Sequence, residues 1–149
     1  MSFITRRLTV GLVAACGALG VAASPAAAYE QTSFSVCNPQ CFAYPHQDEE
    51  EGFVYGTITW YNRTAGVTGE VNSYIEDGLP TIAHFEAYKR STKIASETRT
   101  VANGGRRGFN FTTGDTNLVG GIDRIKITVC TQRNGLPVNC SAPVNYSKP

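Results

Sequence analysis

Apolar residues recur at every second position along much of this chain, and this period limits the folds that it can adopt. The clearest case is residues 122–131, in which apolar side chains alternate with polar ones: Ile125, Ile127 and Val129 against Arg124, Lys126 and Thr128. Residues 53–62 repeat the pattern, with Val54, Ile58 and Trp60 on one face. Such alternation is typical of a β-strand with one buried face and one solvated face.

Other segments with strand character lie between turn residues such as glycine, proline and asparagine. They cover residues 33–36, 67–75, 81–90, 94–101, 108–113 and 137–140. Turn signals recur roughly every 8–14 residues, and no segment has the period of an amphipathic helix. We therefore predict one all-β domain over residues 29–149, an antiparallel, immunoglobulin-like β-sandwich of seven to eight short strands. Residues 29–52 are expected to form its N-terminal loop segment.

Residues 1–28 have the three parts of a secretory signal peptide. Arg6 and Arg7 form a positive start, an apolar run follows to Ala23, and small residues then precede a cleavage site before Tyr29. The apolar run is shorter than the roughly 20 residues that span a bilayer. We predict a secreted, extracellular protein with no transmembrane anchor.

Two other processing routes fit parts of the same leader. The pair Arg6-Arg7 matches part of a twin-arginine signal, and Val13 to Cys16 resembles a lipoprotein cleavage box that would leave Cys16 lipid-anchored. The apolar run continues past Cys16, which favours ordinary cleavage further on.

The mature chain carries almost no net charge. The leader holds two of the 13 basic residues and none of the 12 acidic ones, which leaves a charge of −1 on about 120 residues. Nucleic-acid partners usually require a basic excess, so none is predicted. The acidic run 48–51 beside His46 lacks the alternating ligands of a calcium loop. We predict neither a metal nor a cofactor.

Four cysteines remain after the leader: Cys37, Cys41, Cys130 and Cys140. An even number in an exported chain predicts two disulfides. We favour Cys37–Cys41 and Cys130–Cys140, because a hairpin with a three-residue loop over 134–136 places Cys130 opposite Cys140. Cys130 lies on the face opposite the apolar row, so its bridge should not be the buried pin of antibody domains. Bridges between the N-terminal segment and the hairpin, and a four-cysteine zinc site, remain as alternatives.

Three short runs carry a resemblance to a known group of proteins. They are Gly56 to Thr64 (GTITWYNRT), Thr98 to Val101 (TRTV), and Gly120 to Ile122 (GGI) leading to Val129-Cys130. Together they resemble small secreted β-sandwich proteins of actinobacteria to which no function is assigned. The resemblance implies an all-β secreted domain and brings neither an activity nor site residues.

His84 and Glu86 are the catalytic candidates in a sequence that lacks a hydrolase nucleophile motif. They lie two residues apart on a predicted strand and so share a face, and Arg99 belongs to the segment that follows. Small secreted microbial ribonucleases use a catalytic set of a glutamate, a histidine and an arginine on a sheet. A small secreted hydrolase is therefore one alternative function. Charged residues are also ordinary on the solvated face of an antiparallel sheet, and the near-neutral charge disfavours an RNA substrate.

Two further surfaces are candidate binding sites. Tyr55 and Tyr61 point away from the face of Trp60, and with Tyr74 they would form a strip on which a sugar ring can stack. Arg133 lies beside the Cys130–Cys140 bridge in a stapled loop that would suit a protease inhibitor. Our leading prediction is a secreted, non-enzymatic β-sandwich with a binding or structural role at or outside the cell surface, with a carbohydrate or a protein as partner.

Overall fold

The computed structural model describes residues 29–39, 52–73 and 78–149. These residues form nine strands: β1 (Glu30–Asn38), β2 (Gly52–Trp60), β3 (Thr64–Ser73), β4 (Thr81–Lys89), β5 (Thr92–Val101), β6 (Arg106–Gly114), β7 (Arg124–Arg133), β8 (Leu136–Cys140) and β9 (Val144–Ser147). The described part contains no helix that is long and apolar enough to cross a membrane. The all-β prediction is confirmed.

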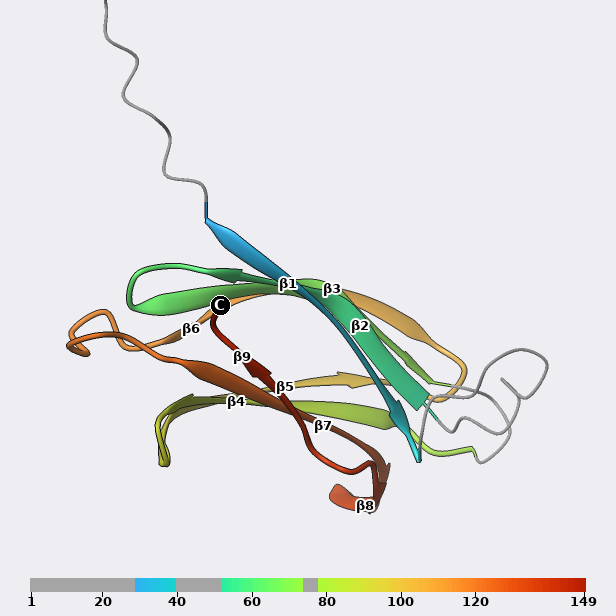
Figure 1. Cartoon of the computed structure of the whole chain (residues 1–149). Coiled ribbons are helices and arrows are strands. Elements are labelled where there is room, and N and C mark those ends of the chain that lie inside the picture. Colours follow the sequence, from blue (N-terminus) through green and yellow to red (C-terminus); the bar gives the residue numbers. More distant parts are fainter. Residues whose placement is uncertain (1–28, 40–51, 74–77) are drawn as a thin grey trace, which may run out of the picture.

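The strands form two antiparallel sheets that pack face to face (Figure 1). Sheet A has the order β1-β2-β3-β6, and sheet B has the order β5-β4-β7-β8, with β9 also pairing to β7. This is the predicted β-sandwich, and β5 lies at one edge of sheet B. The likeness to immunoglobulins is one of architecture, because the first three strands stay in one sheet here, whereas antibody domains combine their strands in a different order.

The strands at both ends of the domain extend beyond the predicted ones. β1 pairs along its whole length with β2, from Glu30 opposite Trp60 to Asn38 opposite Gly52, so part of the predicted N-terminal loop segment is a strand. The C-terminal tail forms β9, which pairs with β7 between Val144 and Ser147. Both strands have weak apolar patterns of their own, and pairing with a strongly alternating neighbour orders them.

The apolar faces of the two sheets meet in a core whose centre is aromatic. Phe85 of β4 contacts three rings from sheet A, at centroid distances of 5.2–6.1 Å: Phe34, Phe109 and Phe111. Trp60 is 2% exposed, and its Nε1 donates a hydrogen bond to Thr32 Oγ1 at 2.9 Å. Trp60 is therefore a core residue, as its face predicted.

Two facing glycines let these rings lie against the backbone of sheet A. Gly56 and Gly69 are register partners on β2 and β3. A Cβ at Gly56 would lie 2.9 Å from Phe34 Cζ, and one at Gly69 would lie 3.0 Å from Phe109 Cζ. Side chains at these two positions would occupy space that the core rings fill.

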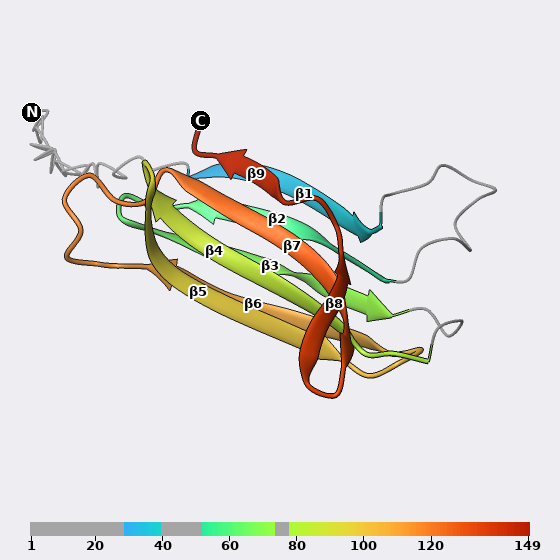
Figure 2. The ribbon, with the colours of Figure 1, turned by 90° about the horizontal axis from the view of Figure 1, so that it is seen from below.

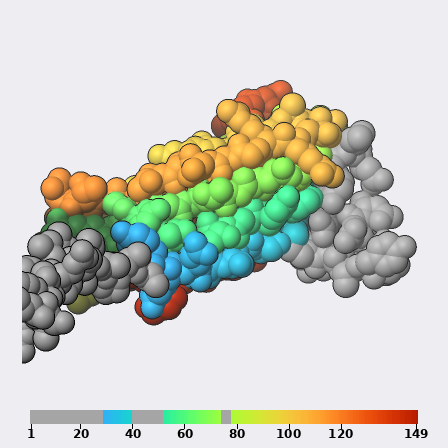
Figure 3. Space-filling view, turned by 90° about the horizontal axis from the view of Figure 1, so that it is seen from above, coloured from blue at the N-terminus to red at the C-terminus, as the bar shows by residue number. Residues whose placement is uncertain are grey.

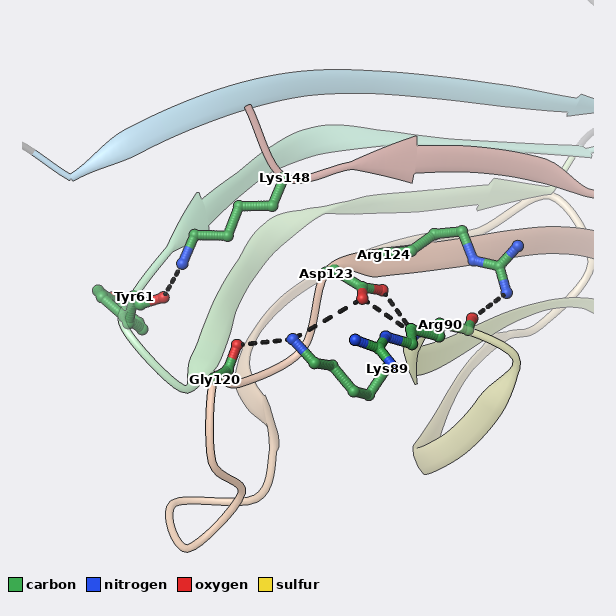
Figure 4. Close-up of polar contacts among 7 residues, drawn as sticks. All are labelled: Tyr61, Lys89, Arg90, Gly120, Asp123, Arg124 and Lys148. Carbon is green, nitrogen blue, oxygen red and sulfur yellow. Dashed lines mark hydrogen bonds and ion pairs between the residues drawn. The ribbon is translucent and has the colours of Figure 1, made fainter.

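Polar contacts fix the end of the sandwich at which β4 turns into β5 (Figure 4). The backbone N–H of Arg90 donates a bifurcated hydrogen bond to the two carboxylate oxygens of Asp123, at 2.9 and 3.1 Å. Lys89 Nζ donates to the Gly120 carbonyl at 2.9 Å, and Arg124 Nη2 donates to the Arg90 carbonyl at 3.2 Å. Arg90 has a φ of 56°, and these contacts hold the turn in that left-handed conformation.

Candidate functional site

The outer face of sheet B carries a groove of about 360 Å³. Side chains from four strands line it: His84 and Glu86 of β4, Lys93, Ser96 and Thr98 of β5, Thr128 and Cys130 of β7, and Pro137 and Cys140 of β8. Figure 2 shows this face, with β8 crossing near the start of β4. The sheet therefore forms the floor of the groove, and the β7–β8 hairpin forms one wall.

A tight turn shapes that hairpin wall. Arg133 pairs with Leu136, which leaves only Asn134 and Gly135 in the loop, with φ values of 52° and 80°. Two positive φ values fit a type I′ turn, the conformation that Asn-Gly favours between twisted strands. The predicted three-residue loop is therefore wrong, because the turn is centred half a residue earlier than the cysteine spacing suggested.

The predicted Cys130–Cys140 disulfide is confirmed, and a bulge makes it possible. With a two-residue turn, Cys130 would face Asn139, but the register shifts between Cys130 and Thr131 so that Cys130 pairs with Cys140. Asn139 has a φ of 44° and is the extra residue. The two Cα atoms lie 4.0 Å apart. Cys130 lies on the outer face, as predicted, and is 2% exposed beneath the hairpin.

The remaining cysteine predictions are resolved in part. Cys37, on the outer face of sheet A, is also disulfide-bonded, and its predicted partner Cys41 lies outside the described residues. Because Cys130 and Cys140 bond to each other, a bridge from the N-terminal segment to the hairpin and a four-cysteine zinc site are excluded.

His84 presents an unpaired imidazole to the groove. Burial lowers the pKa of His84, and the neighbouring Glu86 carboxylate opposes that shift. The ring is therefore neutral at pH 7, with one donor and one acceptor nitrogen. Within the described part of the chain, the His84 imidazole makes no hydrogen bond, and neither do the hydroxyls of Ser96, Thr98 and Thr128. These four groups are available to a ligand.

Glu86, in contrast, is fully engaged by its neighbours. Its carboxylate accepts hydrogen bonds from Lys126 Nζ, from Lys93 Nζ at 3.0 Å and from the Tyr88 hydroxyl at 3.3 Å. The hydrogen bond from Lys126 holds the pKa of Glu86 below its usual value, although burial opposes this shift. The same contact raises the pKa of Lys126. Glu86 is therefore an ionised carboxylate whose protein partners are already in place.

Arg99 does not join His84 and Glu86. It is the register partner of Ala83, a buried residue on the inner face. Its guanidinium lies 4.2 Å from the centroid of the Phe111 ring, and Nη1 contacts Glu97 at 3.1 Å. The groove thus gathers the predicted histidine and glutamate with Lys93, and the arginine of the ribonuclease-like set lies on the other side of the sheet.

The chain matches no family model, no curated protein and no solved structure. The case for a site therefore rests on the geometry of its own residues.

The predicted tyrosine strip lies on the opposite side of the molecule. Tyr55 is 44% exposed on the outer face of sheet A, stacks on Phe53 at 5.7 Å, and donates a hydrogen bond to Glu70, which raises the pKa of Tyr55. Tyr61 follows the other end of β2 and makes an edge-to-face contact with Tyr29. Tyr61 is six residue steps after Tyr55, which corresponds to roughly 20 Å along an extended strand. Tyr74 lies outside the described residues.

The outer face of sheet A is even. Figure 3 shows β1, β2, β3 and β6 side by side on this face without a visible hollow. Ser33, Thr57, Thr68 and Asn110 form one row across the four strands. The face offers hydroxyls and amides in a plane, without walls that would enclose a ligand.

Arg133 lies at the tip of the β7–β8 hairpin and is exposed, as is its partner Leu136 at 68%. The residue after Arg133 has a positive φ, so the backbone turns sharply there and is not extended as in a substrate strand. Arg133 does not line the groove. Protease inhibition through Arg133 stays a prediction.

Sequence reasoning missed several groove residues: Lys93, Ser96, Thr98, Thr128 and Pro137. One signal was available, because Ser96, Thr98 and Thr100 alternate along a single strand. The sequence does not indicate which residues on other strands lie beside them, since only the sheet order shows that β4 lies between β5 and β7. The hairpin wall likewise depends on how β8 folds over the sheet.

Proposed function

We propose that this protein is a secreted, non-enzymatic binding protein that holds a small hydroxyl-rich ligand, such as a sugar unit, in the groove of sheet B. One observation carries this proposal: the neutral His84 imidazole and the hydroxyls of Ser96, Thr98 and Thr128 line one concave surface without protein partners. Ligand sites typically combine a concave shape with a few convergent polar groups. A sugar supplies complementary donors and acceptors.

The shape of the groove supports a ligand of this size. Its volume of about 360 Å³ lies at the lower end of the range of about 300–1,000 Å³ found for small-molecule sites. Pro137 and the Cys130–Cys140 bridge give it an apolar wall, against which the C–H face of a sugar ring can pack. Because the bridge holds this wall in place, the protein loses little conformational entropy when a ligand binds.

The electrostatics favour binding over catalysis. An acid–base catalyst works best with a pKa near the working pH and with access to the reacting proton. The pKa of Glu86 is lowered, and its oxygens already accept hydrogen bonds from Lys126 and Lys93. The alternative of a small hydrolase keeps one favourable observation, namely that His84 and Glu86 line the same groove.

The proposal of secretion is supported by the leader at residues 1–28 and by the disulfides. Disulfides persist in oxidising compartments outside the cytoplasm. Mass spectrometry of the mature protein from culture medium should find Tyr29 as the first residue. An acylated Cys16 would show the lipid-anchored form instead.

Titration calorimetry with a panel of mono- and disaccharides tests the binding proposal. We expect Thr128→Val to weaken binding about two- to tenfold, because one hydrogen bond contributes about 0.5–1.5 kcal/mol. Thr57→Val is the matched control, since Thr57 is equally half-buried but lies on the outer face of sheet A. Absence of millimolar binding to any saccharide, or equal losses in both variants, would contradict the proposal. Turnover of any tested substrate that His84→Ala abolishes would favour the hydrolase.

A further inference from the structure

From the groove, which Lys93 lines, the outer face of sheet B continues into a cluster of cations. His84 pairs with Thr128, Glu86 with Lys126, and Tyr88 with Arg124, so these side chains follow one another along β4 and β7. Lys93 reaches the same face from β5 and contacts Glu86. We call Lys93, Lys126 and Arg124 the cationic row.

The cationic row has more positive charge than its surroundings neutralise. Glu86 is the carboxylate shared by Lys93 and Lys126. Arg124 lies 4.4 Å from the Tyr88 ring centroid and donates to a backbone carbonyl, and among the described residues it has no carboxylate partner. The row and Glu86 together carry a formal charge of +2, on a mature chain whose net charge is −1.

The neighbouring turn adds to this excess. Lys89 and Arg90 contribute two positive charges at the end of β4, and Asp123 contributes one negative charge. That carboxylate already accepts the bifurcated hydrogen bond of the Arg90 N–H and lies 3.9 Å from Lys89 Nζ. The groove therefore opens toward a surface with uncompensated positive charge.

We infer that the ligand of the groove is an acidic oligosaccharide, with one sugar ring among His84, Thr98 and Thr128 and a carboxylate against the cationic row. This inference rests on the proposed function and names the chemical class of its ligand. From His84 to Tyr88 the strand covers roughly 13 Å, which suits a short oligosaccharide better than a single ring. Lys93 has a side chain that is 53% exposed, so it can reach a ligand carboxylate without leaving the surface.

Titration of the mature protein with two oligosaccharides of equal length and linkage tests the inference, one built of neutral hexoses and one of hexuronic acids. We expect the hexuronate to bind roughly two- to fivefold more tightly for each exposed ion pair formed. This advantage should shrink when the salt concentration rises from about 20 to about 300 mM, since salt screens exposed charges.

Lys93→Gln should lower the affinity for the hexuronate more than the affinity for the neutral oligosaccharide, because only the hexuronate brings a carboxylate to this cation. Arg133→Gln removes one exposed positive charge outside the groove and is the control. Equal affinity for the two oligosaccharides, or equal effects of the two variants, overturns the inference while the proposed function stands. Failure of both oligosaccharides to bind overturns the inference, and the proposed function falls with it when the panel of mono- and disaccharides also fails to bind.

Discussion

At the scale of single residues, the absence of a side chain at position 56 decides how the core packs. A Cβ there would lie 2.1 Å from the Thr68 carbonyl oxygen and 2.9 Å from the ring of Phe34. The first contact is with backbone, so it cannot be relieved by a change of rotamer. The alternation of Val54 and Ile58 predicted an inward position for residue 56, but it did not indicate that the space was already filled.

Gly56→Ala should destabilise the protein by about 1–3 kcal/mol, the usual cost of overpacking a well-filled core. Gly108→Ala is the control in the same sheet, because its Cβ would meet only the Gly69 carbonyl oxygen at 3.9 Å. Urea denaturation of both variants measures the difference. A Gly56→Ala protein as stable as Gly108→Ala would show that sheet A can separate from the core rings at no cost.

At the scale of the strands, the Glu86 side chain links three adjacent strands of sheet B. It lies on β4 and bonds to Lys93 on β5 and to Lys126 on β7. The lowered pKa of Glu86 means that folding favours its ionised form. Stabilisation from such a group is present above the unfolded-state pKa, about 4.3 for glutamate, and is lost as the pH falls through the folded-state pKa.

Glu86→Gln should therefore lower the free energy of unfolding at pH 7, by about 1 kcal/mol for a partly exposed pair of contacts. The difference from the unmodified protein should shrink as the pH is lowered from 7 toward about 3, because Glu86 becomes protonated as the pH falls through its folded-state pKa. Urea titrations at the two pH values measure this change. Glu30→Gln serves as control, since Glu30 is exposed and has no ion pair among the described residues. A difference that persists unchanged at acid pH would argue against an ionic contribution.

At the scale of the whole molecule, Tyr146 joins the two sheets along one side of the sandwich. Its hydroxyl donates to the Ser35 carbonyl at 3.1 Å and accepts from the Ser35 N–H at 3.2 Å. Its ring also contacts Phe34 at 6.0 Å. β1 is an edge strand, and this contact satisfies backbone groups that would otherwise be open to pairing with another chain.

Tyr146→Phe should cost about 1–2 kcal/mol, because it removes two hydrogen bonds and keeps the ring. The amide of Ser35 should also exchange its hydrogen faster, which nuclear magnetic resonance can follow. Tyr61→Phe is the control, since the Tyr61 hydroxyl makes no hydrogen bond in the part of the chain that the structure describes. An unchanged rate of hydrogen exchange at the Ser35 amide would mean that packing alone, without these hydrogen bonds, holds the two sheets together along this side.

The two candidate surfaces that the sequence indicated lie on opposite sides of the molecule. Tyr55 and the hydroxyl rows lie on the outer face of sheet A, and His84 and Glu86 lie on the outer face of sheet B. The first face is even (Figure 3), and the second carries the groove. The shape of the second face places the proposed ligand there.

Local alternation was sufficient to predict the β-sandwich, the core position of Trp60 and the shared face of His84 and Glu86, because side chains of a strand alternate whatever its partners are. The Cys130–Cys140 bridge was also predictable, since both cysteines flank one short hairpin. The sequence by itself thus determined which residues face inward and which strands are neighbours in a hairpin.

Only the tertiary structure decided which distant strands lie side by side. The groove exists because β4 lies between β5 and β7 and because a bulge at Asn139 aligns the hairpin wall with the disulfide. Arg99 was separated from His84 by the register of β5, which turns its side chain to the inner face. Sheet order and register depend on contacts between segments far apart in the chain, and no local pattern specifies those contacts.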